Sequence, residues 1–197
     1  MKSRTIGVSS TARTYVIAVI ILSLVANGYL LLQHRQAQVN RMEAVATLAK
    51  DIWVYLGLAE SYLESTLSGG FRSYSDLSKA DPYLLAAANG MRLLQDLDKE
   101  HEGVWLDVQV ALDEARAVIS FDRVGLPPEW DSLTPQASNR LQAMSDLVAE
   151  VRKVFPHEAG IGHGRVSFDL ALLWAADDAA LEFLEMEFED EPLTGPQ

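Results

Sequence analysis

A stretch of 20 residues near the N-terminus, from Thr14 to Gln33, contains no charged side chain. As an α-helix it would be about 30 Å long, which is the thickness of the hydrocarbon core of a bilayer. Most of its residues are Val, Ile, Leu or Ala. The sequence therefore predicts a transmembrane helix over residues 14–33, with the membrane as the partner of this segment.

The same segment has features of a signal peptide. A basic region that includes Arg13 precedes it, and Ala26 and Gly28 are small residues at the −3 and −1 positions of a possible cleavage site. However, the apolar run resumes at Tyr29 and continues to Leu32, whereas the apolar part of a signal peptide spans about 7 to 15 residues. We therefore favour a membrane anchor, and secretion after cleavage is the alternative.

Charge divides sharply along the chain. Residues 1–33 hold three basic residues and no acid, so the formal charge of −12 for the whole chain leaves −15 for the remainder. Basic residues favour the cytoplasmic side, where Lys2, Arg4 and Arg13 compete with Arg35, Arg41 and Lys50 and leave a modest bias. We therefore expect the basic tail, residues 1–13, in the cytoplasm and an acidic domain, residues 34–189, outside it. An acidic surface repels phosphate backbones, which argues against nucleic-acid binding. The chain has no cysteine, which excludes disulfides and cysteine catalysis.

The first helix of the domain is predicted from a heptad pattern. In this pattern Met42, Ala49, Leu56 and Leu63 recur every seven residues. Val45, Ile52 and Ala59 each lie three residues after one of them and form the second line of the seam. No Pro or Gly interrupts residues 29–56, so the predicted membrane helix continues into this one and ends near Ser68-Gly69-Gly70. Residues 69–80 are rich in Ser and Gly and predict a loop.

Three further helices are expected. Asp81-Pro82 predicts the start of a long second helix that ends by Gly125, unless Gly103 bends or divides it. Thr134-Pro135 opens a third, whose apolar face is Ala137, Leu141, Met144, Leu147, Val148, Val151, Val154 and Phe155. A fourth runs from about Arg165 to Glu189, with a stripe of Phe168, Leu172, Ala175, Ala179, Phe183 and Met186, before a flexible tail at residues 190–197.

These elements predict an all-α protein, with an N-terminal transmembrane helix followed by an antiparallel bundle of about four helices. A pair of αα-hairpins, or a homo-oligomer whose helices complete one another's cores, would give the same pattern. No segment shows the alternation of a half-buried strand.

Histidines and carboxylates supply the candidate metal ligands. His157, Glu158 and His163 lie within seven residues of a Gly-rich segment, but their spacing matches none of the usual zinc patterns, so an interhelical loop is the preferred interpretation. His101 lies on the seam of the second helix, where a hydrogen-bonded core residue is the simplest role. No cofactor is predicted.

Candidate partner contacts are aromatic and acidic. From Val166 onward there are nine acids and no Lys or Arg. Asp177, Asp178, Glu182 and Glu185 could bind a basic partner, but a solvated acidic face with a frayed tail is the preferred interpretation. Trp130, in a Pro-rich linker, is the tryptophan best placed for an exposed contact. The other three tryptophans, Trp53, Trp105 and Trp174, lie next to seam positions and are predicted to pack in the core.

No catalytic motif is present: the chain lacks a Gly-rich phosphate loop, a Gly-x-Ser-x-Gly elbow and a Ser-x-x-Lys motif. The sequence favours a non-enzymatic, single-pass membrane protein whose acidic helical domain is an interaction or assembly module for a membrane or envelope protein outside the cytoplasm. The alternative is an extracytoplasmic ligand or metal sensor that signals through a membrane partner.

Overall fold

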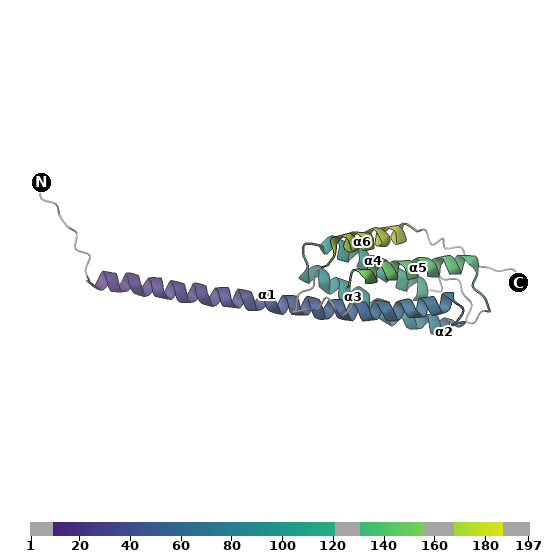
Figure 1. The fold of residues 1–197 in the computed structure, drawn as a ribbon, viewed down its shortest axis with the longest axis horizontal. Coiled ribbons are helices and arrows are strands. Elements are labelled where there is room, and N and C mark those ends of the chain that lie inside the picture. The colour runs from purple at the N-terminus through teal and green to yellow at the C-terminus, as the bar shows by residue number, and fades with distance from the viewer. Residues whose placement is uncertain (1–9, 121–130, 156–167, 187–197) are drawn as a thin grey trace. The chain divides into compact units, whose positions relative to one another are not determined.

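The computed structural model describes residues 10–120, 131–155 and 168–186, without the side chains of residues 10–14, 16–18 and 120. Within these ranges the chain is helical and contains no strand, which confirms the all-α prediction (Figure 1). The chain divides into two compact units, Met1–Arg41 and Met42–Gln197. The second unit contains the helical bundle.

Helix α1 covers Ser10–Leu67. Its heptad pattern is confirmed over its C-terminal half, where Ala49, Ile52, Leu56, Ala59 and Leu63 are buried. The helix ends where the sequence predicts, because Gly69 adopts a left-handed φ of 76° and the backbone N–H of Gly70 donates to the carbonyl of Ser65. A left-handed residue after the last turn is a common helix stop, and glycine adopts it without steric cost.

Among the described residues, no helix combines the length and the apolar character needed to cross a membrane. The predicted transmembrane helix at residues 14–33 is therefore not supported by the structure. Thr14 and residues 16–18 of that segment are among those whose side chains are not described.

The segment predicted as a loop at residues 69–80 is partly helical. It contains one turn of helix, α2 (Tyr74–Leu77), and a 3-10 turn, η1 (Ser78–Ala80). The side chain of Ser73 caps α2 by accepting from the backbone N–H of Asp76, and Leu77 and Ala80 are buried. The two buried residues hold this segment against the bundle, which explains why its Ser-rich composition does not leave it irregular.

The predicted long second helix is two helices, α3 (Asp81–Leu97) and α4 (Glu102–Ser120). The break falls at residues 98–101, just before Gly103, and raises the number of long helices among the described residues to five. Asp98 leaves the helical conformation with φ −124° and ψ 76°. Its carboxylate accepts hydrogen bonds from Trp105 and His101, and such local bonds compete with helix continuation.

Contacts between these helices show antiparallel packing of α1 with α3 and of α3 with α4. Gly90 of α3 lies against Ile52 of α1, and Tyr83 of α3 stacks on Tyr62 of α1. Along α3 and α4, Gln109 accepts from Gln95, and Arg116 donates to Asp81. In both cases a later residue of one helix meets an earlier residue of the other, as in an αα-hairpin.

Helix α5 (Pro135–Lys153) follows the sequence closely. The Thr134 side chain accepts from the backbone N–H of Ala137, which confirms the predicted cap. All eight residues of the predicted apolar face, from Ala137 to Phe155, are buried in the common core.

Helix α6 (Leu170–Glu185) is rotated relative to the prediction. Its buried residues are Leu173, Ala176, Ala180 and Phe183, whereas Ala175 and Met186 of the predicted stripe are exposed. The sequence LALLWAADDAALEFLE has apolar residues on every side, so its periodicity does not select one face. Packing against α4 and α5 makes that choice (Figure 1).

Candidate functional site

The N-terminal part of α1 exposes apolar side chains on all sides. Between 52% and 72% of the side-chain surface is exposed for Tyr15, Val19, Ile20, Ile21, Leu22, Leu24, Val25, Tyr29, Leu30, Leu31 and Leu32. Successive residues of a helix point about 100° apart, so Val19 to Leu22 alone surround it. A helix that is apolar all round is normally covered by protein or lipid. This segment is therefore the strongest candidate for an interaction surface.

Helix α6 positions the predicted acidic contacts. Asp169 caps its N-terminus by accepting from the backbone N–H of Ala171. Asp178, Glu182 and Glu185 are exposed, whereas Asp177 is half-buried on the side that faces α4. Three of the four predicted acids are thus free to meet a partner, and the fourth belongs to a helix–helix contact.

Asp177 and Asp107 bring two carboxyl groups within hydrogen-bond reach of each other, from α6 and α4. Burial raises the pKa of Asp177, and the negative charges of Asp107 and Asp178 raise it further. Within the described part of the chain, Asp177 Oδ1 is buried and accepts no hydrogen bond. The two negative charges of the pair repel each other when both carboxyl groups are ionised.

His101 has the role of a hydrogen-bonded residue. Its Nδ1 lies 2.9 Å from Asp98 Oδ2, which also accepts from Trp105 Nε1 at 3.1 Å. The Trp105 ring is buried and packs against Phe155 and Phe168, with ring centroids 5.9 Å and 4.9 Å away. These groups pack together where the start of α4, the end of α5 and the residue Phe168 before α6 meet.

The three described tryptophans differ in burial. Trp105 is buried and Trp53 is partly buried against the core, as predicted. Trp174 is 56% exposed, so its predicted place in the core is wrong. Its exposure follows from the rotation of α6, because Leu173 and Ala176, rather than Trp174, face the bundle. Trp130 lies outside the described residues.

The candidate metal ligands His157, Glu158 and His163, for which an interhelical loop is the preferred interpretation, also lie outside the described residues. Among the side chains that the structure does describe, no three of His, Asp or Glu come together in a way that could hold a metal ion. Asp107 and Asp177 lack a third ligand of this kind.

Sequence reasoning missed the contact of Arg152 with α1. The Arg152 guanidinium lies over the Trp53 ring, with Cζ 4.3 Å from the centroid, and its Nη1 donates to Glu60 Oε2. Arg152 and Glu60 are 92 residues apart in sequence, and neither belongs to a motif. No local pattern could have paired them.

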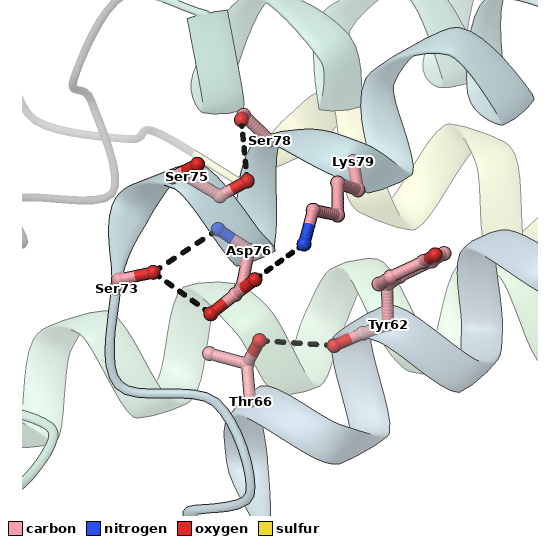
Figure 2. A network of polar contacts seen from close by, with 7 residues as sticks. All are labelled: Tyr62, Thr66, Ser73, Ser75, Asp76, Ser78 and Lys79. Atoms are coloured by element: carbon pink, nitrogen blue, oxygen red, sulfur yellow. Dashed lines mark hydrogen bonds and ion pairs between the residues drawn. The ribbon is translucent and has the colours of Figure 1, made fainter.

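A polar network also joins α2 and η1 at the C-terminal end of α1 (Figure 2). Asp76 accepts from Lys79 Nζ at 2.5 Å and from the Ser73 hydroxyl at 2.8 Å. The hydrogen bond from Lys79 makes the largest contribution to lowering the pKa of Asp76, and the one from Ser73 lowers it further. The hydrogen bond to the Asp76 carboxylate raises the pKa of Lys79. The Thr66 hydroxyl donates to the Tyr62 carbonyl within α1. The hydrogen bonds of Ser73 and Lys79 with Asp76 fix the conformation of this turn.

Comparisons with protein-family models, with curated proteins and with solved structures find no significant match to this chain.

Proposed function

We propose that this chain is a non-enzymatic interaction or assembly module, held at a membrane by the segment from Thr14 to Gln33, with its acidic helical bundle outside the cytoplasm. The observation that supports this most strongly is the exposed apolar surface of α1 between Tyr15 and Leu32. Exposed apolar area of this extent carries a large free-energy cost in water, about 25 cal/mol for each Å². Lipid around the helix removes that cost.

The charge distribution supports the orientation. Lys2, Arg4 and Arg13 precede the segment and compete with Arg35, Arg41 and Lys50 after it, so the bias toward a cytoplasmic N-terminus is modest. The remainder of the chain carries −15. Basic residues are retained on the cytoplasmic side, while anionic lipid headgroups repel an acidic domain from their surface. The bundle is therefore available to a protein partner beside the membrane.

Membrane fractionation of the full chain tests the anchor. We expect the native chain to stay in the membrane pellet after alkaline carbonate extraction. A variant with Leu24→Arg and Leu31→Arg should move to the supernatant. The charge at Leu24 would lie at mid-membrane, at a cost of about 2.5 to 3.5 kcal/mol on insertion scales, and the charge at Leu31 would shorten the apolar run. The matched control, Leu24→Ile with Leu31→Ile, should stay in the pellet. Native chain in the supernatant would contradict the anchor.

A reporter fused to the C-terminus tests the orientation. A reporter that is active only in the cytoplasm should be silent, and one that is active only outside should give signal. The opposite pair of results would reverse the proposed topology. Mass spectrometry of the purified chain separates an anchor from a cleaved signal peptide, since cleavage after Gly28 would remove the residues before Tyr29.

The sensor alternative has no specific observation in its favour, and among the described residues no cluster of His, Asp and Glu could hold a metal ion. The interaction module is therefore the function that the available geometry supports best.

A further inference from the structure

Helix α6 carries a second apolar stripe on the side away from the bundle core. Its members are Leu170, Trp174 and Leu181, which are 54%, 56% and 43% exposed. At about 100° per residue, these three positions fall within about 40° of one another around the helix. The core contacts are made by the opposite side, which includes Ala176 and Phe183. The stripe lies away from the core, and Asp177 and Asp178 occupy the helical positions between Trp174 and Leu181.

Acidic side chains line one edge of this stripe. Asp178, Glu182 and Glu185 are exposed, and none of them forms an ion pair within the described part of the chain. Five acids and no basic residue lie between Asp169 and Glu185. The outer face of α6 thus combines an exposed tryptophan, flanking aliphatic groups and unneutralised negative charge.

We propose that this outer face of α6 binds an amphipathic helix of a partner protein, one with an apolar stripe flanked by Lys or Arg. This inference rests on the proposed function, since it names the surface of the module and the chemistry of its partner. Trp174 would supply the buried anchor, because tryptophan is enriched among the residues that dominate binding energy. The three acids would set orientation and select against acidic segments.

Charge decides between the possible occupants. A second copy of this chain that docked through the same face would bring two acidic surfaces together, and like charges across an interface cost free energy. An anionic lipid surface is repelled for the same reason. A basic amphipathic helix offers both an apolar stripe for Trp174 and positive charge for Asp178, Glu182 and Glu185.

Site-specific photocrosslinking of the full chain in its native membrane tests this assignment. The crosslinking amino acid benzoylphenylalanine replaces Trp174, and in a matched control it replaces Leu93, which is 54% exposed on α3. The crosslinked partner peptide is then sequenced by mass spectrometry. We expect an adduct at position 174 with a segment that has helical apolar periodicity and flanking Lys or Arg, and no adduct with that segment at position 93.

Charge reversal adds a second readout in the same chain. The substitutions Asp178→Lys, Glu182→Lys and Glu185→Lys should lower the adduct yield at position 174 by about tenfold, because three attractive contacts become repulsive. A control that reverses three exposed acids of α1, Glu43, Asp51 and Glu64, should leave the yield within about twofold. Circular dichroism of each variant verifies that the helices remain folded.

Several results would overturn the inference. One is an adduct at position 174 with a second copy of the chain, with lipid or with an acidic segment. Another is the absence of any adduct at position 174. A third is an adduct yield that charge reversal does not change. Adducts at position 93 alone, with the chain in the membrane fraction, would reject the α6 surface and leave the proposed function standing. Loss of the chain from the membrane fraction would contradict the proposed function itself.

Discussion

The guanidinium group of Arg152 on α5 occupies the space that a side chain at Gly57 on α1 would fill. A Cβ added at Gly57 would lie 2.9 Å from Arg152 Cζ, closer than real contacts allow. Glycine at this position lets the guanidinium lie flat against α1, where it meets Trp53 and Glu60. Through these contacts the Arg152 side chain connects the last turn of α5 to the part of α1 that packs in the bundle.

A double-mutant cycle measures the coupling free energy between Glu60 and Arg152. Glu60→Gln and Arg152→Gln should each destabilise the bundle, with a coupling free energy of about 1 kcal/mol, since both side chains are largely buried. The control is the exposed pair of Glu150 and Lys153 on the same helix, whose coupling should stay below about 0.5 kcal/mol. Chemical denaturation followed by circular dichroism gives the four free energies, and equal couplings in the two pairs would argue against a special role for Arg152.

Gly90→Ala should destabilise the bundle. The added Cβ would lie 2.5 Å from Cγ1 of Ile52, which is buried and cannot move away freely. Overpacking of this kind costs about 1 to 3 kcal/mol. Gly103→Ala is the control, because no atom lies within 4 Å of its added Cβ, and alanine should stabilise α4 by up to about 1 kcal/mol. The prediction fails if both substitutions change the denaturation midpoint in the same direction.

Asp177→Asn should stabilise the bundle at neutral pH. Its pKa is raised in the folded chain, so the folded state binds the proton more tightly than the unfolded state. Stability therefore increases as pH falls through the folded pKa, and the full cost of the charge is present above it. We expect a gain of up to about 1 kcal/mol at pH 7, limited by the partial exposure of the group.

The pH dependence provides the check. The advantage of the Asn variant should shrink as pH falls and vanish below the ordinary range of an aspartate pKa, where both chains are uncharged at this site. Glu182→Gln, at an exposed position of the same helix, should change stability by less than about 0.5 kcal/mol at pH 7. A gain for Asp177→Asn that persists unchanged at low pH would point to a cause other than charge.

Asp98→Ala should destabilise the connection between α3 and α4. The substitution leaves the buried Trp105 indole N–H without its acceptor, at a cost of about 1 to 3 kcal/mol. Asp98→Asn retains a side-chain oxygen that can accept this hydrogen bond, so its cost should be clearly smaller. Denaturation of the two variants beside the native chain distinguishes a lost acceptor from a lost charge, and equal costs would assign the effect to the charge.

The two tryptophans that differ in exposure test the orientation of α6. Trp105→Ala should cost about 3 to 5 kcal/mol, as truncation of a buried aromatic side chain does. Trp174→Ala should change stability by less than about 0.5 kcal/mol, because the side chain is mostly in water. Similar losses for both variants would mean that the rotation of α6 described above is incorrect.

The sequence by itself determined the parts of the fold that depend on local chemistry. The end of α1 at Gly69, the Thr134 cap of α5 and the buried faces of α1 and α5 all follow from neighbouring residues with one clear periodicity. The apolar segment of α1 could also be predicted from the sequence, because its composition alone identifies it without any contact to another part of the chain.

Only the tertiary structure decided the remainder. Helix α6 has apolar residues all round, so contact with α4 and α5, and not its own pattern, selects Leu173 as a core residue and Trp174 as an exposed one. The pairing of Arg152 with Glu60 and the meeting of Asp107 with Asp177 join segments that are distant in sequence. Such contacts depend on how the helices pack together, and local propensity contains no information about that arrangement.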